Sequence, residues 1–414
     1  MVDERTSTTR TAGPFSAPDV LARVLETARH DDFEGYSKHD ALNARWLERA
    51  AGGSRYTRLV ATQVVMRSPI DIRPIARVQK ARNAKGLSLF ARALLSRYRV
   101  AGTDRDAAEA KALLDWLIDH PSPATAAGGS GTFPGLGWGY PYPWQDVGFF
   151  APRHFPNRVV TSFVGQGLLD AYETLGDTRY LDAASDVARF LLDSPKTLFE
   201  DEDRRCVSYV PDESITWIVM DVSALVGAFA GRLGALCGDA QLVAEGGRLV
   251  AYVVSKQTDD GAWFYAEPPT ASHITHDNYH TGFILDAIGT YSRAAGSRQF
   301  DKAYQRGIEF YERHLFEPDG AARFMSDRLY PIDIHGCAQG IITFSLQQKW
   351  YGTGREQARE ILDWTLANMW DPKSGWFYYQ KRRGYRTKIR ELRWCQAWMS
   401  LALATYLEVC EPGR

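Results

Sequence analysis

Apolar segments with helical spacing recur along the chain at intervals of about 57 residues, which indicates a repeated structural unit. Each segment carries few charges, and four of them end on a glycine and a small polar residue, as is typical of a helix C-cap and tight turn. Because they are apolar on nearly all sides, we expect them to be buried. They predict six inner helices, near residues 84–99, 161–175, 223–237, 280–295, 336–350 and 393–409.

A second set of helices is more charged and amphipathic. Residues 178–193 and 356–370 place apolar side chains at helical spacing with charges opposite, and a helix of this kind follows five of the apolar segments. Residues 17–30 can supply the sixth and close the circle. The pattern predicts an all-α fold, the (α/α)6 toroid, as a single domain over residues 16–410 after a flexible stretch 1–15.

The connections between these helices differ at the two ends of the repeat. Turns from an inner helix to its amphipathic successor are short, about two to five residues, whereas connections to the next inner helix run to about 20 residues or more. Several of the long loops hold aromatic stretches such as GWGYPYPW and GWFYYQK, which we expect to form short hairpins. Because every long loop leads into an inner helix, the loops should meet at one mouth, where the helix N-termini favour anions.

Charge and composition narrow the set of partners. The formal net charge of -1 and pI of about 6.8 give no long-range field to collect nucleic acid or an anionic membrane. No run of about 18 apolar residues or secretory leader is present, so we predict no membrane insertion. The five cysteines lack paired CxxC spacing and predict free thiols in a reducing compartment, hence a cytoplasmic protein. The oligomeric state is left open.

Polar residues concentrate where the long loops enter the inner helices. Asp277 with His280, and Asp333 with His335, form two acid–histidine pairs at equivalent positions of successive repeats, while Arg393 opens the sixth inner helix. We expect this placement to bring them to one pocket, because an unpaired buried charge would otherwise be costly. The other candidates for catalysis or substrate binding are Tyr279, Trp394, Gln396, Trp144, Gln145, Trp138, Arg158, His276, Tyr36, Lys38 and Asp40.

The stretch HITHDNYHTG holds three histidines just ahead of an inner helix. His276 and His280 are four residues apart and would share a helical face, as zinc ligands do, with His273 a turn earlier. No cysteine lies near, and Asp277 suits an N-cap, so we predict neither a metal nor another cofactor. For both acid–histidine pairs two interpretations remain, a helix cap with packed histidines or an acid/base and substrate-binding site.

Several segments together resemble a known group of proteins. They are GYSKHDALN, GWGYPYPWQ, VVTSFVGQGLLDAYETLGDTRYLDAA, HDNYHTGF, LYPIDIHGCAQGI and RWCQAWM. They are similar to bacterial and archaeal (α/α)6 proteins of exopolysaccharide and surface-glycan biosynthesis and, more distantly, to the helical domain of D-glucuronyl C5-epimerases. The resemblance spans roughly residues 35–405 and implies the toroid fold and an oligo- or polysaccharide substrate.

Three functions follow from these candidates. The leading hypothesis is C5-epimerase-like chemistry on a uronate, with Arg393 or Arg158 holding the carboxylate and Asp277, Tyr279, His280 and His335 as candidate bases. The first alternative is an inverting glycoside hydrolase that uses Asp277 and Asp333 as its two carboxylates, or a lyase on the same fold. The second is a non-catalytic glycan-binding or assembly protein. For the pocket we expect walls formed by Trp138, Trp144, Tyr279 and Trp394.

Overall fold

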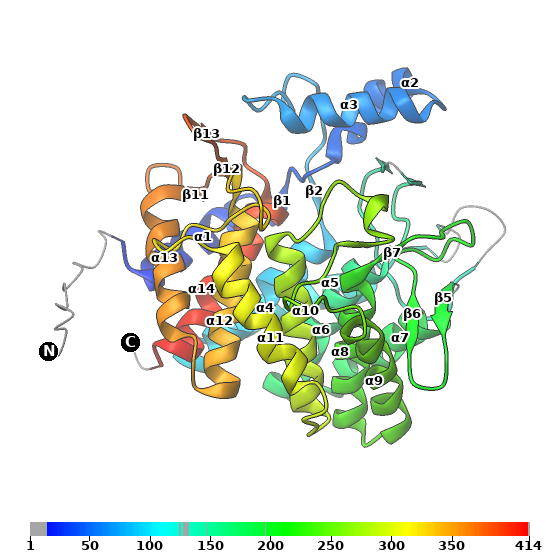
Figure 1. Ribbon diagram of the computed structural model, residues 1–414. Helices are drawn as coiled ribbons and strands as arrows, with labels where there is room; N and C mark the ends of the chain where they lie inside the picture. The colour runs from blue at the N-terminus through cyan, green and yellow to red at the C-terminus, as the bar shows by residue number, and fades with distance from the viewer. Residues whose placement is uncertain (1–14, 124–125, 127–131, 147, 195, 413–414) are drawn as a thin grey trace, which may run out of the picture.

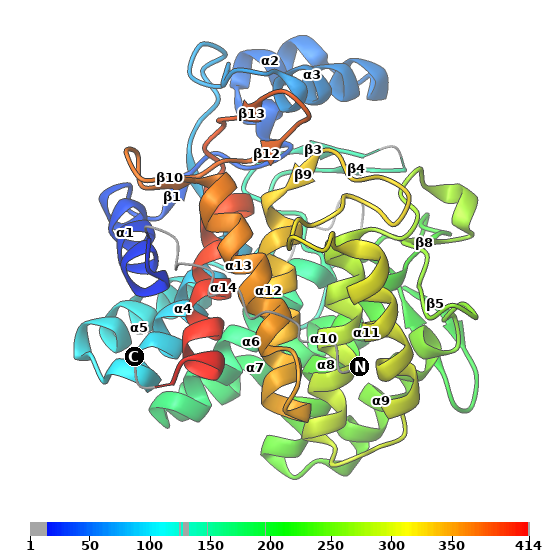
Figure 2. The same cartoon turned by 60° about the vertical axis from the view of Figure 1, so that its left-hand side comes forward.

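The computed structural model describes residues 15–123, 126, 132–146, 148–194 and 196–412. Apart from residue 15, the predicted flexible stretch 1–15 lies outside the described residues. Figure 1 shows a ring of helices with long loops gathered at one end, and Figure 2 shows the same arrangement from a second side.

Six inner helices form a closed ring, as the apolar repeats predict. Each contacts the next in chain order, and the last contacts the first. They are α4 (Ala84–Ala101), α6 (Arg158–Leu175), α8 (Met220–Cys237), α10 (Asn278–Ala294), α12 (Ile334–Tyr351) and α14 (Trp398–Cys410), the last preceded by the π-helical η4 (Leu392–Ala397). The all-α (α/α)6 toroid is therefore confirmed.

An outer helix packs on each inner helix. The members of this layer are α5 (Asp104–Asp119), α7 (Thr178–Asp193), α9 (Ala240–Val254), α11 (Asp301–Leu315), α13 (Arg355–Met369) and α1 (Ala17–His30). In α7, for example, Tyr180, Ala184, Val187 and Leu191 recur at helical spacing and are buried. The N-terminal helix α1 packs on α14, so the first and last helices of the repeat complete the double ring as predicted.

Short turns at the end opposite the mouth depend on glycine. The residues that cap α4, α6, α8 and α12 adopt left-handed backbone conformations, which glycine tolerates without a steric penalty. These residues are Gly102, Gly176, Gly238 and Gly352, with φ between 65° and 76°. The chain therefore turns directly into the next outer helix, and the long connections all fall at the other end.

Small antiparallel sheets brace the long loops at the mouth. The two-stranded ones are β1 (Glu34–Gly35) with β2 (Ala81–Arg82), β3 (Trp144–Gln145) with β4 (Phe150–Ala151), β5 (Thr197–Glu200) with β6 (Arg205–Val207), β7 (Ile218–Val219) with β8 (Ala266–Glu267), and β10 (Trp370–Asp371) with β11 (Trp376–Phe377). A three-stranded sheet joins β13 (Arg386–Thr387), β12 (Gln380–Lys381) and β9 (Ile332–Asp333). Through β9, one sheet leads directly into inner helix α12.

The stretch 35–47, which carries the predicted substrate-binding residues Tyr36, Lys38 and Asp40, is partly helical. It contributes the 3-10 turn η1 (Asp40–Asn43) and the start of α2 (Arg45–Ala51), which is followed by α3 (Arg55–Arg67). Both views show α2 and α3 standing above the mouth, apart from the two helical layers (Figures 1 and 2). Trp46 Nε1 donates a hydrogen bond to the carbonyl of Ala76 at 2.6 Å and ties the two ends of this excursion together.

Cys337 and Cys395 are buried in inner elements, as predicted, and burial raises the pKa of both thiols. All five cysteines have a free thiol. Among the described residues, α8 is long and apolar enough to cross a membrane, but 72% of this stretch is buried. Its apolar surface is therefore covered by neighbouring helices, as in the core of a ring.

Candidate functional site

Every inner helix carries an ionisable residue at or near its first turn. These residues are Lys85 on α4, Arg158 on α6, Asp221 on α8, Asp277 and His280 at α10, Asp333 and His335 at α12, and Arg393 in η4. The six helices run in the same direction, so these groups meet at the mouth. We define the mouth cluster as these first-turn residues without Arg158, together with Lys38, Tyr279 and Trp394. Its side chains are buried or half-buried.

Asp277 and His280 form a dyad at the start of α10. Asp277 occupies the N-cap position, yet its carboxylate makes no capping bond. Its Oδ2 instead lies 2.8 Å from His280 Nδ1, which fixes the imidazole proton on Nδ1 and leaves Nε2 as the basic nitrogen. No described residue hydrogen-bonds to Nε2, and the side chain is 16% exposed. The helix-cap interpretation of this pair is therefore wrong.

Tyr279 and His335 stack face to face inside the cluster. Their ring centroids are 4.4 Å apart with the planes 7° from parallel. Trp394 and Trp398 lie against His335, with centroids at 4.5 and 4.4 Å. Burial lowers the pKa of His335 well below its usual range and raises the pKa of Tyr279 well above 10. The imidazole is therefore neutral and the phenol keeps its proton.

Both ring nitrogens of His335 are buried without a hydrogen-bond partner among the described residues. An unsatisfied buried polar atom is costly, by about 1–3 kcal/mol, and is uncommon in folded proteins. Tyr279, one helix away, covers one face of this ring. A polar group that reached the cluster would find these nitrogens available.

Asp333 serves the fold, in contrast to its equivalent Asp277. Its Oδ1 accepts the backbone N–H of His335 at 3.0 Å and the indole N–H of Trp394 at 2.8 Å, while Oδ2 accepts from Gln380 at 2.9 Å. These three donors hold the carboxylate in place. The helix-cap interpretation applies here, and the predicted acid/base role of Asp333 is not supported by this geometry. Asp333 is instead a positioning residue for Trp394 and His335.

Substituting Asp333 by Asn should lower the free energy of unfolding by about 2–3 kcal/mol, because the amide cannot accept from all three buried donors. Urea denaturation of the variant measures this loss. The matched control is Asp239→Asn, since Asp239 is an N-cap that accepts only from two backbone N–H groups at the surface. The control should cost less than about 1 kcal/mol. Equal losses in the two variants would contradict the account of Asp333.

Three basic side chains surround the stacked rings, those of Lys38, Lys85 and Arg393. Lys38 Nζ lies 3.8 Å from the Trp394 ring centroid. Lys85 Nζ lies 4.1 to 5.1 Å from the rings of Phe163, Phe283 and Trp398, which come from three different inner helices, so it occupies the centre of the ring.

Neither lysine forms a salt bridge with a described residue, and burial lowers the pKa of both. Arg393 donates from Nε to Ser37 Oγ at 2.9 Å, and its guanidinium lies 5.2 Å from the Tyr140 and Trp394 rings. The basic groups at the centre of the mouth thus lie against aromatic faces rather than against acids.

Trp144 lies beside the cluster, and Gln145 and Gln396 support the backbone around it. Trp144 contacts the ring of His39 at 5.7 Å and belongs to an aromatic group with Tyr140 and Tyr209. Gln145 donates to two carbonyls within the β3–β4 hairpin. Gln396 exchanges two hydrogen bonds with the backbone of Phe377. The two glutamine side chains are therefore occupied, and we no longer assign them to substrate.

Three other predicted site residues lie away from the cluster. Arg158 is fully buried and donates to Ser208 and to the carbonyls of residues 191, 194 and 208, so it ties α6 to the outer layer and cannot bind a substrate carboxylate. Trp138 is buried and donates to the carbonyl of Leu117. His276 packs between Phe264 and Phe310. Arg158 and His276 lie at or next to a helix start, where a side chain can point outward as easily as inward, and Trp138 lies in the loop before β3. The prediction that these three residues line the pocket is therefore corrected.

Tyr36 and Asp40 hold the segment that carries Lys38. Tyr36 forms a β-bridge with Glu391, and Asp40 accepts from Arg73 Nε at 2.8 Å. Arg73 Nη2 also bonds Glu391 Oε1 at 3.0 Å, all inside the protein. These residues position Lys38 and η4 rather than contact a ligand.

The sequence interpretation missed Lys85, Asp221, His39 and Tyr265. Lys85 and Asp221 are each the one charged residue in the first two turns of an inner helix, in AKGLSLF and MDVSALVG, and that signal could have found them. Burial raises the pKa of Asp221. Tyr265 lies 4.5 Å from the His280 ring. His39 and Tyr265 come from irregular loops, where no periodicity indicates direction.

The three histidines of the HITHDNYH stretch do not converge. His280 faces Asp277 and Tyr265, whereas His276 is turned toward the outer helix α11. Among the described residues, no group of three or more His, Cys, Asp or Glu side chains is arranged to hold a metal ion.

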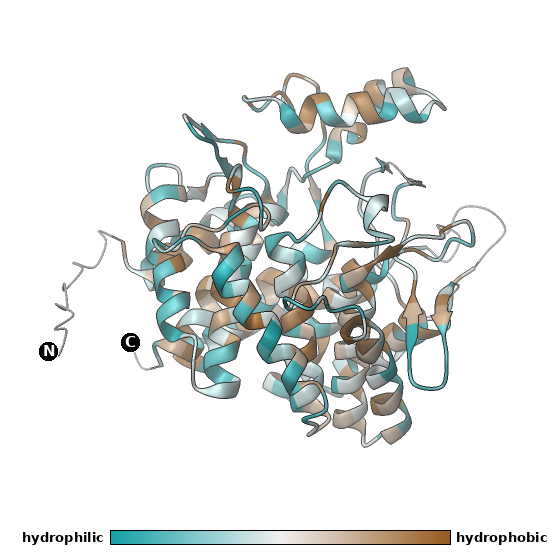
Figure 3. Cartoon of the chain, viewed as in Figure 1, coloured by the Kyte–Doolittle hydropathy of each residue, from teal (hydrophilic) through white to brown (hydrophobic). Residues whose placement is uncertain are grey.

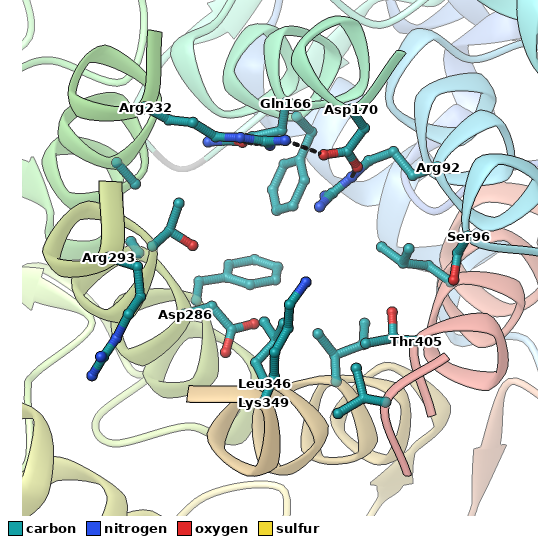
Figure 4. Close-up of a pocket in the computed structure, with 18 of the residues that line it drawn as sticks. Arg92, Ser96, Gln166, Asp170, Arg232, Asp286, Arg293, Leu346, Lys349 and Thr405 are labelled. Atoms are coloured by element: carbon teal, nitrogen blue, oxygen red, sulfur yellow. Dashed lines mark hydrogen bonds and ion pairs between the residues drawn. The ribbon is translucent and has the colours of Figure 1, made fainter. Parts of the chain in front are cut away.

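A cavity of about 440 Å³ lies at the end of the ring opposite the mouth (Figure 4). Arg92 and Arg232 both bond Asp170 on its wall, at 2.8 and 2.6 Å. Phe163, Phe283 and Trp398 line this cavity and also contact Lys85, so they lie between it and the mouth cluster. Asp286, Arg293 and Lys349 also line this cavity and form no salt bridge with a described residue. We place the candidate site at the mouth because it brings the Asp277–His280 dyad together with the unpartnered ring nitrogens of His335.

The fold defines the class of the protein as an (α/α)6 toroid, and solved structures of that class match it. No family model matches the chain, and no curated protein matches its sequence. A cellobiose 2-epimerase from Bacillus thermoamylovorans is similar with a TM-score of 0.61 at 12% identity, covering 80% of this chain and 90% of that one.

Two further structures match over nearly the whole chain. A family 76 α-mannanase from Bacteroides thetaiotaomicron has a TM-score of 0.64 at 11% identity, with 96% of both chains covered. An unsaturated glucuronyl hydrolase specific for heparin has a TM-score of 0.59 at 13% identity, with 95% and 96% covered. At these identities the likeness establishes the fold.

Proposed function

We propose that the protein is a carbohydrate-active enzyme that acts on a uronate-containing oligo- or polysaccharide by proton transfer at C5, as an epimerase does. The observation that carries this proposal is the Asp277–His280 dyad. His280 Nε2 has no hydrogen-bond partner among the described residues, and the His280 ring lies against the ring of Tyr279. An imidazole nitrogen without a hydrogen-bond partner can accept a proton, and a phenol can donate one, which is the pair needed to remove a proton from one face of a carbon and return one to the other. The sugar-processing names of the structural neighbours support a saccharide substrate.

In the proposed reaction, His280 Nε2 takes the C5 proton and becomes an imidazolium that Asp277 stabilises. The electron pair of the broken C–H bond moves into the adjacent carboxylate and forms an enediolate. Lys38 and Arg393 offset its growing negative charge, which lowers the barrier. The hydroxyl of Tyr279 then delivers its proton to the opposite face of C5, and the electron pair returns to form the new C–H bond. The imidazolium of His280 releases its proton to solvent and the phenolate of Tyr279 takes one up, so both groups return to their starting states.

The inverting-hydrolase alternative is weaker on the same evidence. It requires one carboxylic acid that donates a proton and a second carboxylate that activates water. Asp333 is held by three donors, and Asp277 is bonded to His280, so neither is a free general acid. A non-catalytic glycan-binding role does not explain why Asp277 is hydrogen-bonded to His280.

The test of the proposed function is incubation with a panel of uronate-containing oligosaccharides, read by NMR for the C5 configuration and by a reducing-end assay. We expect a change of C5 configuration with no new reducing ends. Unsaturated products would identify a lyase, and saturated fragments with new reducing ends would identify a hydrolase. Binding of the glycans without any product would contradict the enzymatic proposal.

Replacing Lys38 by Met should lower kcat/KM for a uronate substrate about 10- to 100-fold, the loss expected when the enediolate loses one hydrogen bond to a charged group. The melting temperature should change little, because Lys38 makes no salt bridge with a described residue and Met retains its apolar stem. Steady-state kinetics measures the effect. The control is Lys388→Met, an exposed lysine that also lies over an aromatic ring, with Nζ 5.7 Å from the Tyr378 centroid. An unchanged kcat/KM for Lys38→Met would remove Lys38 from the proposed site.

A further inference from the structure

The α2–α3 excursion exposes an unusual amount of apolar surface. Of the ten large hydrophobic side chains exposed among the described residues, six lie between residues 46 and 75. They are 53% to 81% exposed, and we call them the hairpin surface: Trp46, Tyr56, Val60, Val64, Ile70 and Ile75. Exposed apolar side chains that gather in one region indicate an interaction surface.

Three apolar side chains of α3 lie along one exposed face, away from the rest of the molecule. Tyr56, Val60 and Val64 are spaced four residues apart and are exposed, whereas Thr62 and Val65 on another face are buried. Figure 3 shows hydrophobic positions along α3 at the outermost part of the chain. This helix therefore presents apolar side chains outward from a protruding element.

Positive charge surrounds the same surface. Residues 45–67 hold five arginines and one acid, Glu48, although the whole chain has a net charge of -1. Arg45, Arg49 and Arg67 are exposed, and no described residue forms a salt bridge with them. The near-neutral total thus hides a local basic patch, which the net-charge argument from the sequence could not detect.

We propose that the α2–α3 hairpin docks on an anionic lipid bilayer, with the hairpin surface in the interface and the arginines on the headgroups. An apolar face flanked by arginines, with Trp and Tyr among its side chains, is the pattern of an interfacial helix. Anionic lipids supply the complementary charge. A second copy of this chain seated symmetrically on the same surface would bring arginines against arginines, which opposes self-association.

Docking of this kind is peripheral and directs the mouth toward the lipid. α3 packs against β3, and Trp144 of β3 contacts His39 beside the mouth cluster. A glycan near the membrane surface would therefore meet the candidate site directly. Lipid binding itself does not depend on the proposed function, so each can fail without the other.

The test is co-sedimentation of the full chain with phosphatidylcholine vesicles, either pure or with about one third phosphatidylserine. We expect binding at least about tenfold stronger to the anionic vesicles and weakened by added salt. The triple variant Tyr56→Ser, Val60→Ser, Val64→Ser and the double variant Arg45→Glu, Arg67→Glu should each reduce it about tenfold or more. All five positions are exposed, and circular dichroism confirms that each variant is folded.

Matched controls use exposed residues elsewhere. Tyr385→Ser removes an exposed aromatic residue, and Arg298→Glu changes a charge whose side chain is 92% exposed, both outside the hairpin. Both should bind vesicles as the unchanged protein does. Equal binding to neutral and anionic vesicles, no binding to either, or sedimentation showing a dimer that the triple variant abolishes would each overturn the proposal.

Discussion

Substituting His280 by Asn should reduce kcat by about 10²- to 10⁴-fold, the contribution typical of a general base. Asn can still donate a hydrogen bond toward Asp277 but has no basic nitrogen to take a proton. The stability should change little, because no described residue bonds to Nε2 and the ring is partly exposed. Rapid-quench or steady-state kinetics on the substrate found in the panel measures the loss.

The matched control for this variant is His314→Asn. His314 also stacks on an aromatic ring, Phe310, at 4.8 Å, but it lies on outer helix α11. Its substitution should leave kcat unchanged. If His280→Asn turned over the substrate at the normal rate, the imidazole would not be the proton acceptor and the proposed mechanism would be wrong.

Replacing Arg73 by Met should lower the free energy of unfolding by about 3–5 kcal/mol, because it leaves Asp40 and Glu391 buried without their cation. Burial raises the pKa of Glu391 to about 7 and raises the pKa of Asp40. A raised carboxyl pKa contributes stability that is present at low pH and lost as the pH rises through the folded-state value. The defect should therefore be smaller at pH near 5 than near 8.

Urea denaturation at both pH values measures this effect. The control is Arg82→Met, whose partner Asp32 is largely exposed, and which should cost less than about 1 kcal/mol at either pH. Because Arg73 joins the segment of Lys38 to η4, activity should fall with stability. A penalty below about 1 kcal/mol in Arg73→Met would show that the buried network does not hold the mouth together.

The ring itself could be predicted because its signal is periodic. The predicted start of the first inner helix at residue 84 is the observed one, and α7 is found at residues 178–193 as expected. An inner helix must be apolar on nearly all sides, and an outer helix on one, so the sequence distinguishes the two layers. The hairpin α2–α3 was not predicted from the sequence, because the ring does not bury its helices and several of their apolar residues face outward.

The sequence was sufficient to locate the candidate site but not to assign a role to each of its residues. The sequence predicted that ionisable side chains gather at the starts of the inner helices. Asp277, His280, His335 and Arg393 do so. Direction around the helix was not predictable: Arg158 begins α6 yet turns to the outer layer, whereas Lys85 turns to the centre. Asp277 and Asp333 occupy equivalent positions but differ in hydrogen bonding, and only the neighbouring loops decide that difference.

The most direct measurement of the central claim is deuterium uptake from D2O at C5 of a uronate-containing oligosaccharide, followed by NMR and mass spectrometry. The account predicts that the unchanged protein incorporates deuterium at C5 without creating reducing ends. It also predicts incorporation at least about a hundredfold slower with His280→Asn and unchanged with His314→Asn. Reducing ends that accumulate while C5 keeps its hydrogen, or equal deuterium uptake with and without His280, would contradict proton transfer by the Asp277–His280 dyad.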